Sequence, residues 1–262
     1  MAVKLNFISI GTQMINALIV GGFVGGIAGY IGSLMLSKRM ALMGGALGHL
    51  TLPGISLALL YNFDVSIGAI IFLTFGILLI WILEKKTKLP LEALTATVFA
   101  SSISIAFLFL PKEEALIALI GDVSQISTFA VIITISTSLI VFFISKYIYS
   151  KVILMNISED LAQSIGINTS IYNLIYLTCI ALTVGVGVRV VGGLMTAALV
   201  AIPASTSKNI SNNLFQYSYI SAVLGILSCI VGIAGSMIIG FPAGPLIIIS
   251  STFFFLISIF FR

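Results

Sequence analysis

Long apolar segments follow one another along the chain, with only short polar stretches between them. Most approach the roughly 20 residues that an α-helix needs to cross the hydrocarbon core of a membrane. The segments are 12–36, 41–60, 65–83, 93–110, 128–149, 170–188, 190–207, 217–240 and 245–261. Gly192, Gly193 and Pro203 interrupt the seventh, so it either spans the membrane or forms a broken, re-entrant segment. The pattern predicts an all-α integral membrane protein, a polytopic bundle of eight or nine transmembrane segments.

The charge content excludes a soluble domain. Charged residues make up 8% of the chain, whereas a soluble domain has about 25%. The first ten residues lead into an apolar run without a small-residue cleavage site, so we expect no cleaved signal peptide. Cys179 and Cys229 lie in apolar segments and are interpreted as buried small hydrophobes. We expect one domain over 1–262, with membrane lipids around it and no nucleic-acid partner, since basic residues are scattered at segment ends.

The distribution of basic residues predicts the orientation, because cytoplasmic ends carry an excess of Lys and Arg. An external N-terminus gives nine basic residues inside and three outside, and leaves the C-terminus in the cytoplasm. The inside set is Lys38, Arg39, Lys85, Lys86, Lys88, Lys146, Lys151, Lys208 and Arg262; the outside set is Lys4, Lys112 and Arg189.

The first segment carries glycines at four-residue spacing, at Gly21, Gly25 and Gly29. Small residues so spaced let two helix backbones approach closely, which is how helices associate in lipid. We interpret this stripe as a helix-packing face rather than a pore lining.

His49 is the only histidine and lies in the second segment. A polar ionisable group at that depth faces either a hydrogen-bond partner on a neighbouring helix or a transport pathway. Neutral imidazole is also a ligand for divalent transition metals. Pro53 and Gly54 weaken the helix just after it, and irregular backbone in a membrane is tolerated only against protein or a cavity. This favours the pathway.

Two carboxylates are weaker candidates. Glu92 opens the fourth segment, where it is either a helix-start carboxylate near the interface or part of the pathway. Asp122 belongs to an acidic external loop with Glu113 and Glu114, which is either solvated or a mouth that attracts cations.

The longest internal loop contains "NISEDLAQSIGIN", residues 156–168. Ser158 is suited to cap a short helix, and Glu159 and Asp160 suit its first turn. Leu161 and Ile165 share one face, and Gly166 suits the position after the helix end. The predicted helix is either a connector on the membrane surface or a helix that docks into a partner.

Catalytic motifs are absent from the sequence. There is no G-x-x-x-x-G-K-[ST] phosphate loop, no H-E-x-x-H and no G-x-S-x-G elbow. We therefore expect no enzyme activity and no cofactor in this chain.

Five ordered motifs resemble those of the membrane permeases of bacterial ABC importers for zinc, manganese and iron. They are "KRMALMGGALGHLTLPGISLALL" (38–60), "LIGDVSQIS" (119–127), "NISEDLAQSIGIN" (156–168), "VRVVGGLMTAALVAIPASTSKNI" (188–210) and "FPAGPLIIIS" (241–250). The family usually has an Asp four residues before the histidine, where this chain has Gly45. Some zinc permeases also carry a histidine in the fourth span, and "FASSIS" (99–104) has none.

The resemblance implies a permease in the bacterial inner membrane that forms the pathway as a homodimer. It implies two cytoplasmic ATPase subunits, which hold the loop helix (within 151–169) as a coupling helix, and an extracytoplasmic protein that delivers the metal. We expect the transported ion to be zinc first and manganese or iron next, with His49, Glu92 and Asp122 as transient metal sites. The alternative is a stand-alone secondary transporter or channel for cations, which would leave the capped loop helix unexplained.

Overall fold

The apolar segments fold into helices because a backbone in lipid must satisfy its N–H and C=O groups within its own segment. The computed structural model describes residues 2–38, 40, 43–61, 63–87, 89, 91–109, 121, 126–193 and 195–261, and their regular secondary structure is entirely helical. The helices are α1 (Ala2–Ser37), α2 (Met43–Leu50), α3 (Leu52–Tyr61), α4 (Val65–Thr87), α5 (Leu91–Phe109), α7 (Thr128–Ile157), α8 (Glu159–Ser164), α9 (Thr169–Val191), α10 (Thr196–Ile210), α11 (Leu214–Ile239) and α12 (Ala243–Ser258), followed by the 3₁₀ turn η1 (Ile259–Phe261). The predicted all-α class is confirmed over this part of the chain.

Six helices within the described ranges are long and apolar enough to cross a membrane. They lie in α1, α4, α7, α9, α11 and α12 with η1, while the apolar stretches Ala46–Ala58 and Ala93–Ala106 are shorter. The predicted number of eight or nine membrane segments is therefore not confirmed. One reason is that the second segment is divided at Thr51 into α2 and α3. Another is that the seventh contributes only α10, whose 15 residues rise about 22 Å.

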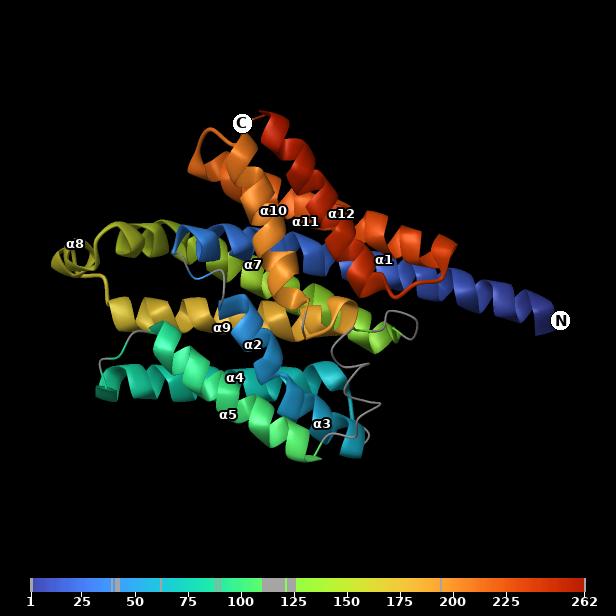
Figure 1. Ribbon diagram of the computed structural model, residues 1–262, viewed down its shortest axis with the longest axis horizontal. Helices are drawn as coiled ribbons and strands as arrows, with labels where there is room; N and C mark the ends of the chain where they lie inside the picture. Colours follow the sequence, from blue (N-terminus) through green and yellow to red (C-terminus); the bar gives the residue numbers. More distant parts are fainter. Residues whose placement is uncertain are drawn as a thin grey trace.

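Helices α1, α7 and α9 run along the length of the molecule, with α10, α11 and α12 on one side and α2 to α5 on the other (Figure 1). Helix α1 packs against α7, α9, α10 and α11, and α9 also packs against α4. Helix α8 lies at the end of the molecule opposite the N-terminus (Figure 1). Helices α1 and α9 therefore form the centre of the bundle.

The glycine stripe of α1 is a packing face, as the four-residue spacing predicts. A Cβ atom at Gly25 would lie 2.7 Å from the carbonyl carbon of Gly225 on α11 and 2.8 Å from Sγ of Cys229. One turn further, the Ser221 hydroxyl donates a 2.6 Å hydrogen bond to the Gly29 carbonyl oxygen. The two backbones are thus in direct contact, and only glycine fits at the crossing.

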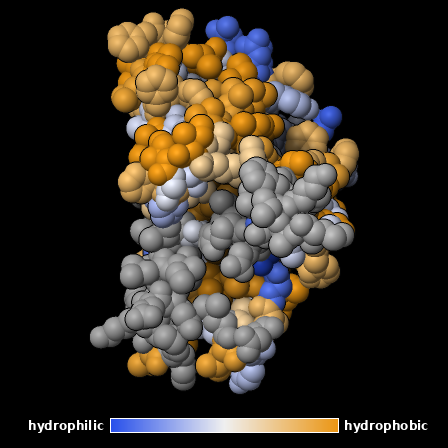
Figure 2. Space-filling view, turned by 90° about the vertical axis from the view of Figure 1, so that its right-hand side faces the viewer, coloured by the Kyte–Doolittle hydropathy of each residue, from blue (hydrophilic) through white to orange (hydrophobic). Residues whose placement is uncertain are grey.

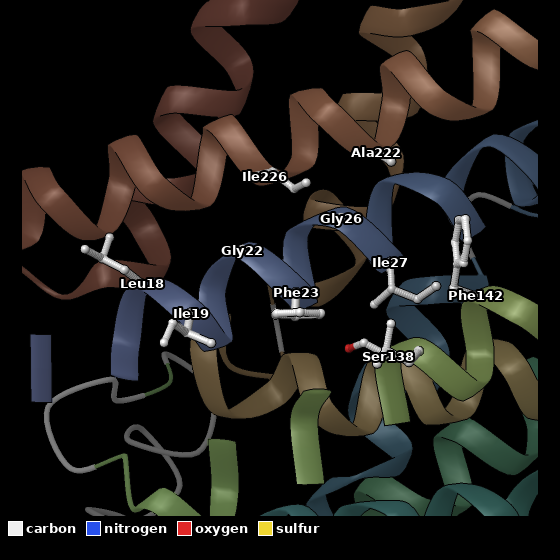
Figure 3. Close-up of a pocket in the computed structure, with 11 residues that line it drawn as sticks. Leu18, Ile19, Gly22, Phe23, Gly26, Ile27, Ser138, Phe142, Ala222 and Ile226 are labelled. Atoms are coloured by element: carbon white, nitrogen blue, oxygen red, sulfur yellow. The ribbon is translucent and has the colours of Figure 1, made fainter. Parts of the chain in front are cut away.

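Gly22 lies on another face of α1, where a Cβ atom would meet nothing within 4 Å. It lines an apolar groove of about 480 Å³ between α1, α7 and α11, in which Ser138 supplies a polar side chain (Figure 3). The glycines of α1 therefore serve two different surfaces.

Large hydrophobic side chains are also common on the outside of the bundle. Phe75, Phe143 and Phe253 are each 60% or more exposed. Figure 2 looks onto the end where the N-terminus lies, and hydrophobic residues make up most of the described surface there. Such a surface is stable in lipid and would aggregate in water.

Candidate translocation pathway

His49 occupies the last turn of α2 and is half-buried. Its ring lies 5.3 Å from the ring of Phe99 on α5, between centroids, and the two planes are tilted by 50°. Its Nδ1 atom is buried and has no hydrogen-bond partner among the described residues. Of the two alternatives, a hydrogen bond from this atom to a neighbouring helix is not observed among those residues, and a buried nitrogen of this kind can serve as a ligand or acceptor.

Helix α2 ends directly after His49 because the chain turns at Thr51. The Thr51 hydroxyl donates a 2.5 Å hydrogen bond to the Gly48 carbonyl oxygen. Pro53 follows in the first turn of α3, where its missing N–H costs nothing. At the break, the Thr51 N–H donates to the carbonyl oxygen of Gly48, three residues before it, instead of continuing the α-helical pattern. Irregular backbone and an imidazole are therefore found at the same depth of an apolar bundle.

The face of α5 that meets α2 carries two buried hydroxyl groups, those of Thr95 and Ser102. The Thr95 Oγ1 atom is buried and makes no hydrogen bond to any described residue. Glu92 lies three residues before Thr95 and seven before Phe99, so all three share one face of α5. Seven residues rise about 10 Å, which places Glu92 two turns from the His49 contact. The structure describes the backbone of Glu92 and not its side chain.

Glycine contacts hold α2 against the linker between α9 and α10. A Cβ atom at Gly48 would overlap the carbonyl oxygen of Gly193, and one at Gly193 would lie 3.1 Å from the Gly48 carbonyl oxygen. Gly121 also packs here: its φ is +78°, and a Cβ on it would lie 2.5 Å from the Gly192 nitrogen. Three of the five quoted motifs, 38–60, 119–127 and 188–210, thus meet at this linker. Asp122 lies outside the described residues.

An ion pair that the sequence analysis missed joins Arg189, at the end of α9, to Asp64, just before α4. The two side chains are 2.8 Å apart and only 17% and 15% exposed. The residues are 125 positions apart, so no local pattern could reveal the pair. Arg189 is therefore held by a carboxylate at the edge of the bundle.

The predicted loop helix is present as α8. The Ser158 side chain accepts a hydrogen bond from the Leu161 N–H, Glu159 and Asp160 fall in the first turn, and Gly166 has a φ of +83°. Leu161 is 50% exposed and Ile165 is 62% exposed. The predicted capping is thus confirmed, and two apolar side chains, Leu161 in α8 and Ile165 at its C-cap, face outward.

Lys38 lies at the same end of the molecule, directly after α1. Its ammonium group donates a 2.6 Å hydrogen bond to the Asn173 side-chain oxygen and lies 5.3 Å from the ring centroid of Tyr176. Burial lowers the pKa of Lys38, and attraction to Glu84 and Glu159 opposes that shift. Lys38 therefore joins the end of α1 to α9 through Asn173 and Tyr176.

No group of three or more His, Cys, Asp or Glu side chains that could hold a metal is found in the described part of the chain. Cys179 and Cys229 are buried and unbridged, as expected of small hydrophobes. His49 on α2 and Glu92 on α5 are placed on facing helices. The residues around Ser158 follow the C-terminal end of α7 and belong to a separate part of the molecule.

The long apolar helices and the hydrophobic outer surface of the described residues define the class of this molecule, a multi-pass integral membrane protein. The chain belongs to the ABC 3 transport family, whose profile matches residues 11–262. It is thus a permease of an ABC transporter, and this confirms the class of protein that the five motifs indicate.

Several known proteins are similar over nearly their whole length. The "High-affinity zinc uptake system membrane protein ZnuB" of Buchnera aphidicola subsp. Baizongia pistaciae is 29% identical, over 88% of this chain and 91% of the relative. The "Manganese import system permease protein ScaB" of Streptococcus parasanguinis is 26% identical, over 94% of this chain and 89% of the relative. The solved structure "PsaBC from Streptococcus pneumoniae in complex with Fab" has the same fold, with a TM-score of 0.83 and 22% identity over 98% of this chain and 95% of that chain.

Proposed function

We propose that this protein is the permease subunit of an ATP-driven importer of divalent metal ions, with zinc as the first choice and manganese or iron next. The proposal rests above all on the family match over residues 11–262 and on relatives named for zinc and manganese uptake. The buried Nδ1 atom of His49 agrees with it, because imidazole binds all of these metals.

His49 is the proposed transient ligand, with Glu92 further along the pathway and Asp122 at the outer mouth. One imidazole with at most one carboxylate would bind the ion weakly, and conduction requires binding weak enough to release. Gly45 replaces the carboxylate that the family usually has one turn before the histidine. The site would therefore hold the ion only briefly.

The proposed assembly is a homodimer with two cytoplasmic ATPase subunits and an extracytoplasmic metal-binding protein. Residues 1–262 form one permease domain in the bacterial inner membrane, with eight or nine membrane segments, an external N-terminus and a cytoplasmic C-terminus. The loop at about 151–169 is the proposed ATPase contact, in which Ser158 caps α8. The exposed side chains of Leu161 and Ile165 support this, since an outward apolar pair is typical of a docking surface.

Gentle extraction of the tagged chain from native membranes tests the assembly. We expect a stoichiometric partner that carries a phosphate-loop ATPase domain. A homo-oligomer without an ATPase, under conditions that preserve related complexes, would contradict the proposal and favour a secondary transporter.

Uptake into vesicles that contain the purified complex tests the site. His49→Ala should reduce ATP-dependent zinc or manganese uptake at least tenfold. Ser56→Ala is the matched control, because the Ser56 hydroxyl is buried and, within the described part of the chain, bonds only to Leu52 of its own helix. Full uptake by His49→Ala would make the imidazole structural, and the ratio of zinc to manganese uptake identifies the ion.

A further inference from the structure

A second groove lies between α7 and α9 on the outside of the bundle, next to the loop that follows α8. Its volume is about 600 Å³, within the roughly 300–1,000 Å³ of ligand pockets. One end is apolar and the other is polar. It is lined by Phe143, Ile144, Tyr147, Ile148, Gly166, Asn168, Ile171, Tyr172 and Ile175.

The length of α7 and its residue pattern indicate that the groove crosses the boundary between the hydrocarbon core and the headgroups. Helix α7 has 30 residues and is about 45 Å long, against about 30 Å for the core. Its second half carries the lysines Lys146 and Lys151 and the 74%-exposed Tyr147. Tyrosine and lysine at this level are typical of the membrane interface. The groove therefore begins at the interface and continues toward Phe143, which lies in the apolar region.

Lys151 lies beside this groove, against two of the tyrosines that line it. Its ammonium group lies 4.8 Å from the ring centroid of Tyr147 and 4.6 Å from that of Tyr172, and it donates a hydrogen bond to the Tyr172 hydroxyl. No carboxylate in the described ranges forms an ion pair with it. A fixed cation with two tyrosine hydroxyls close by is suited to bind an anion.

Asn168, which lines the groove, adds a donor. Its side-chain oxygen accepts a hydrogen bond from the Ile171 N–H as the cap of α9. Because this bond uses only the side-chain oxygen, the Asn168 amide nitrogen can act as a donor group in addition to the Lys151 ammonium group.

We propose that the groove binds one anionic phospholipid, with the phosphate at Lys151 and an acyl chain along the apolar end between α7 and α9. Charge complementarity favours this occupant, because a cation meets the headgroup and apolar side chains meet the chain. Basic pockets between membrane helices bind anionic headgroups in the same way. The site does not depend on which ion the permease carries.

Native mass spectrometry of the detergent-purified protein, with any partners that co-purify, tests the site. The protein is titrated with phosphatidylglycerol and with phosphatidylcholine of the same chains. We expect one retained phosphatidylglycerol per permease and about a fivefold preference over phosphatidylcholine, the effect of one lysine near anionic lipid. Lys151→Gln should abolish the preference. Lys146→Gln should preserve it, because Lys146 is on the same helix but, among the described residues, has no contact with Tyr147 or Tyr172 like that of Lys151. Ile171→Trp should fill the groove and release both lipids.

Five results would overturn the proposal. These are equal binding of the two lipids by the unmodified protein, an equal loss of preference in Lys151→Gln and Lys146→Gln, and retention of the lipid by Ile171→Trp. The fourth is displacement of phosphatidylglycerol by an equal concentration of glycerol phosphate, which would define an anion site without an acyl chain. Crosslinking of Ile171→Cys to itself between two copies would assign the groove to a second permease instead.

Discussion

Replacement of Gly25 by alanine should separate α1 from α11. The new Cβ would lie 2.7 Å from the Gly225 carbonyl carbon, whereas carbon atoms pack at about 3.5–4.0 Å. The helices must therefore move apart by about 1 Å at the crossing. Because the partner atoms belong to the backbone of α11, no side-chain rotation can relieve the overlap.

The cost has two parts. Overpacking of a tight interface costs about 1–3 kcal/mol. The 2.6 Å bond from Ser221 to Gly29 would lengthen beyond hydrogen-bond range, a loss of about 0.6 kcal/mol for a bond between membrane helices. We expect the free energy of unfolding to fall by about 2–3 kcal/mol, which corresponds to a melting temperature lower by roughly 5–10 °C.

Thermal unfolding in detergent, followed by the loss of the monodisperse elution peak, measures this difference. Gly22→Ala is the matched control, since it lies one turn away on the same helix and its Cβ would meet nothing within 4 Å. Melting temperatures of the two variants within one or two degrees of each other would refute the close-contact argument.

Three further predictions concern the charged and exposed residues. Leu161→Glu with Ile165→Glu should abolish ATPase co-purification while the permease melts as before, because both side chains are exposed. Asp64→Asn should lower the free energy of unfolding by about 1–2 kcal/mol, because it leaves the mostly buried Arg189 without the carboxylate of Asp64. Adding Arg189→Met should restore part of the lost stability, as measured in the same thermal assay. Burial holds the pKa of Lys38 below its ordinary 10.5, so the unfolded chain binds the proton more tightly. The free energy of unfolding should therefore rise with pH in the window just below 10.5. Lys38→Met should lack this rise, as measured by denaturation at a series of pH values.

Each of these predictions has a control or a contrary result. Gln163→Glu adds charge to α8 away from Leu161 and should leave ATPase binding intact, while binding by the double variant would refute docking through α8. An unchanged Asp64→Asn melting curve would make the ion pair energetically neutral. Equal pH dependence in Lys38→Met and in the unmodified protein would assign the change to other groups.

The helices and their caps could be predicted because their signals are local. The apolar lengths located the helices, Ser158 and Gly166 bounded α8, and the spacing of Gly21, Gly25 and Gly29 predicted a close crossing. Each of these depends on residues within a turn or two of one another.

The interior of the candidate site could be predicted only in part. His49 was evident as the single histidine, and Pro53 indicated a weak helix, but the break falls at Thr51 because proline occupies the first turn of the next helix. The buried hydroxyl of Thr95 is one of many in the sequence and became evident only when α5 was placed against α2. The pair of Asp64 and Arg189 depends on chain topology, which no local pattern records.

Because α7 is continuous, it can transmit motion from the loop that contains α8 to its opposite end. Thr128–Ile157 is one uninterrupted helix, a stiff rod about 45 Å long. Its N-terminal end is held by the Ser127 cap and by a hydrogen bond from the Asn16 side-chain amide of α1 to the Ile126 carbonyl oxygen. A sideways displacement of α8 would therefore be carried along α7 as a tilt of one rigid element, and it would reach the opposite end, where Ile126 bonds to Asn16 of α1.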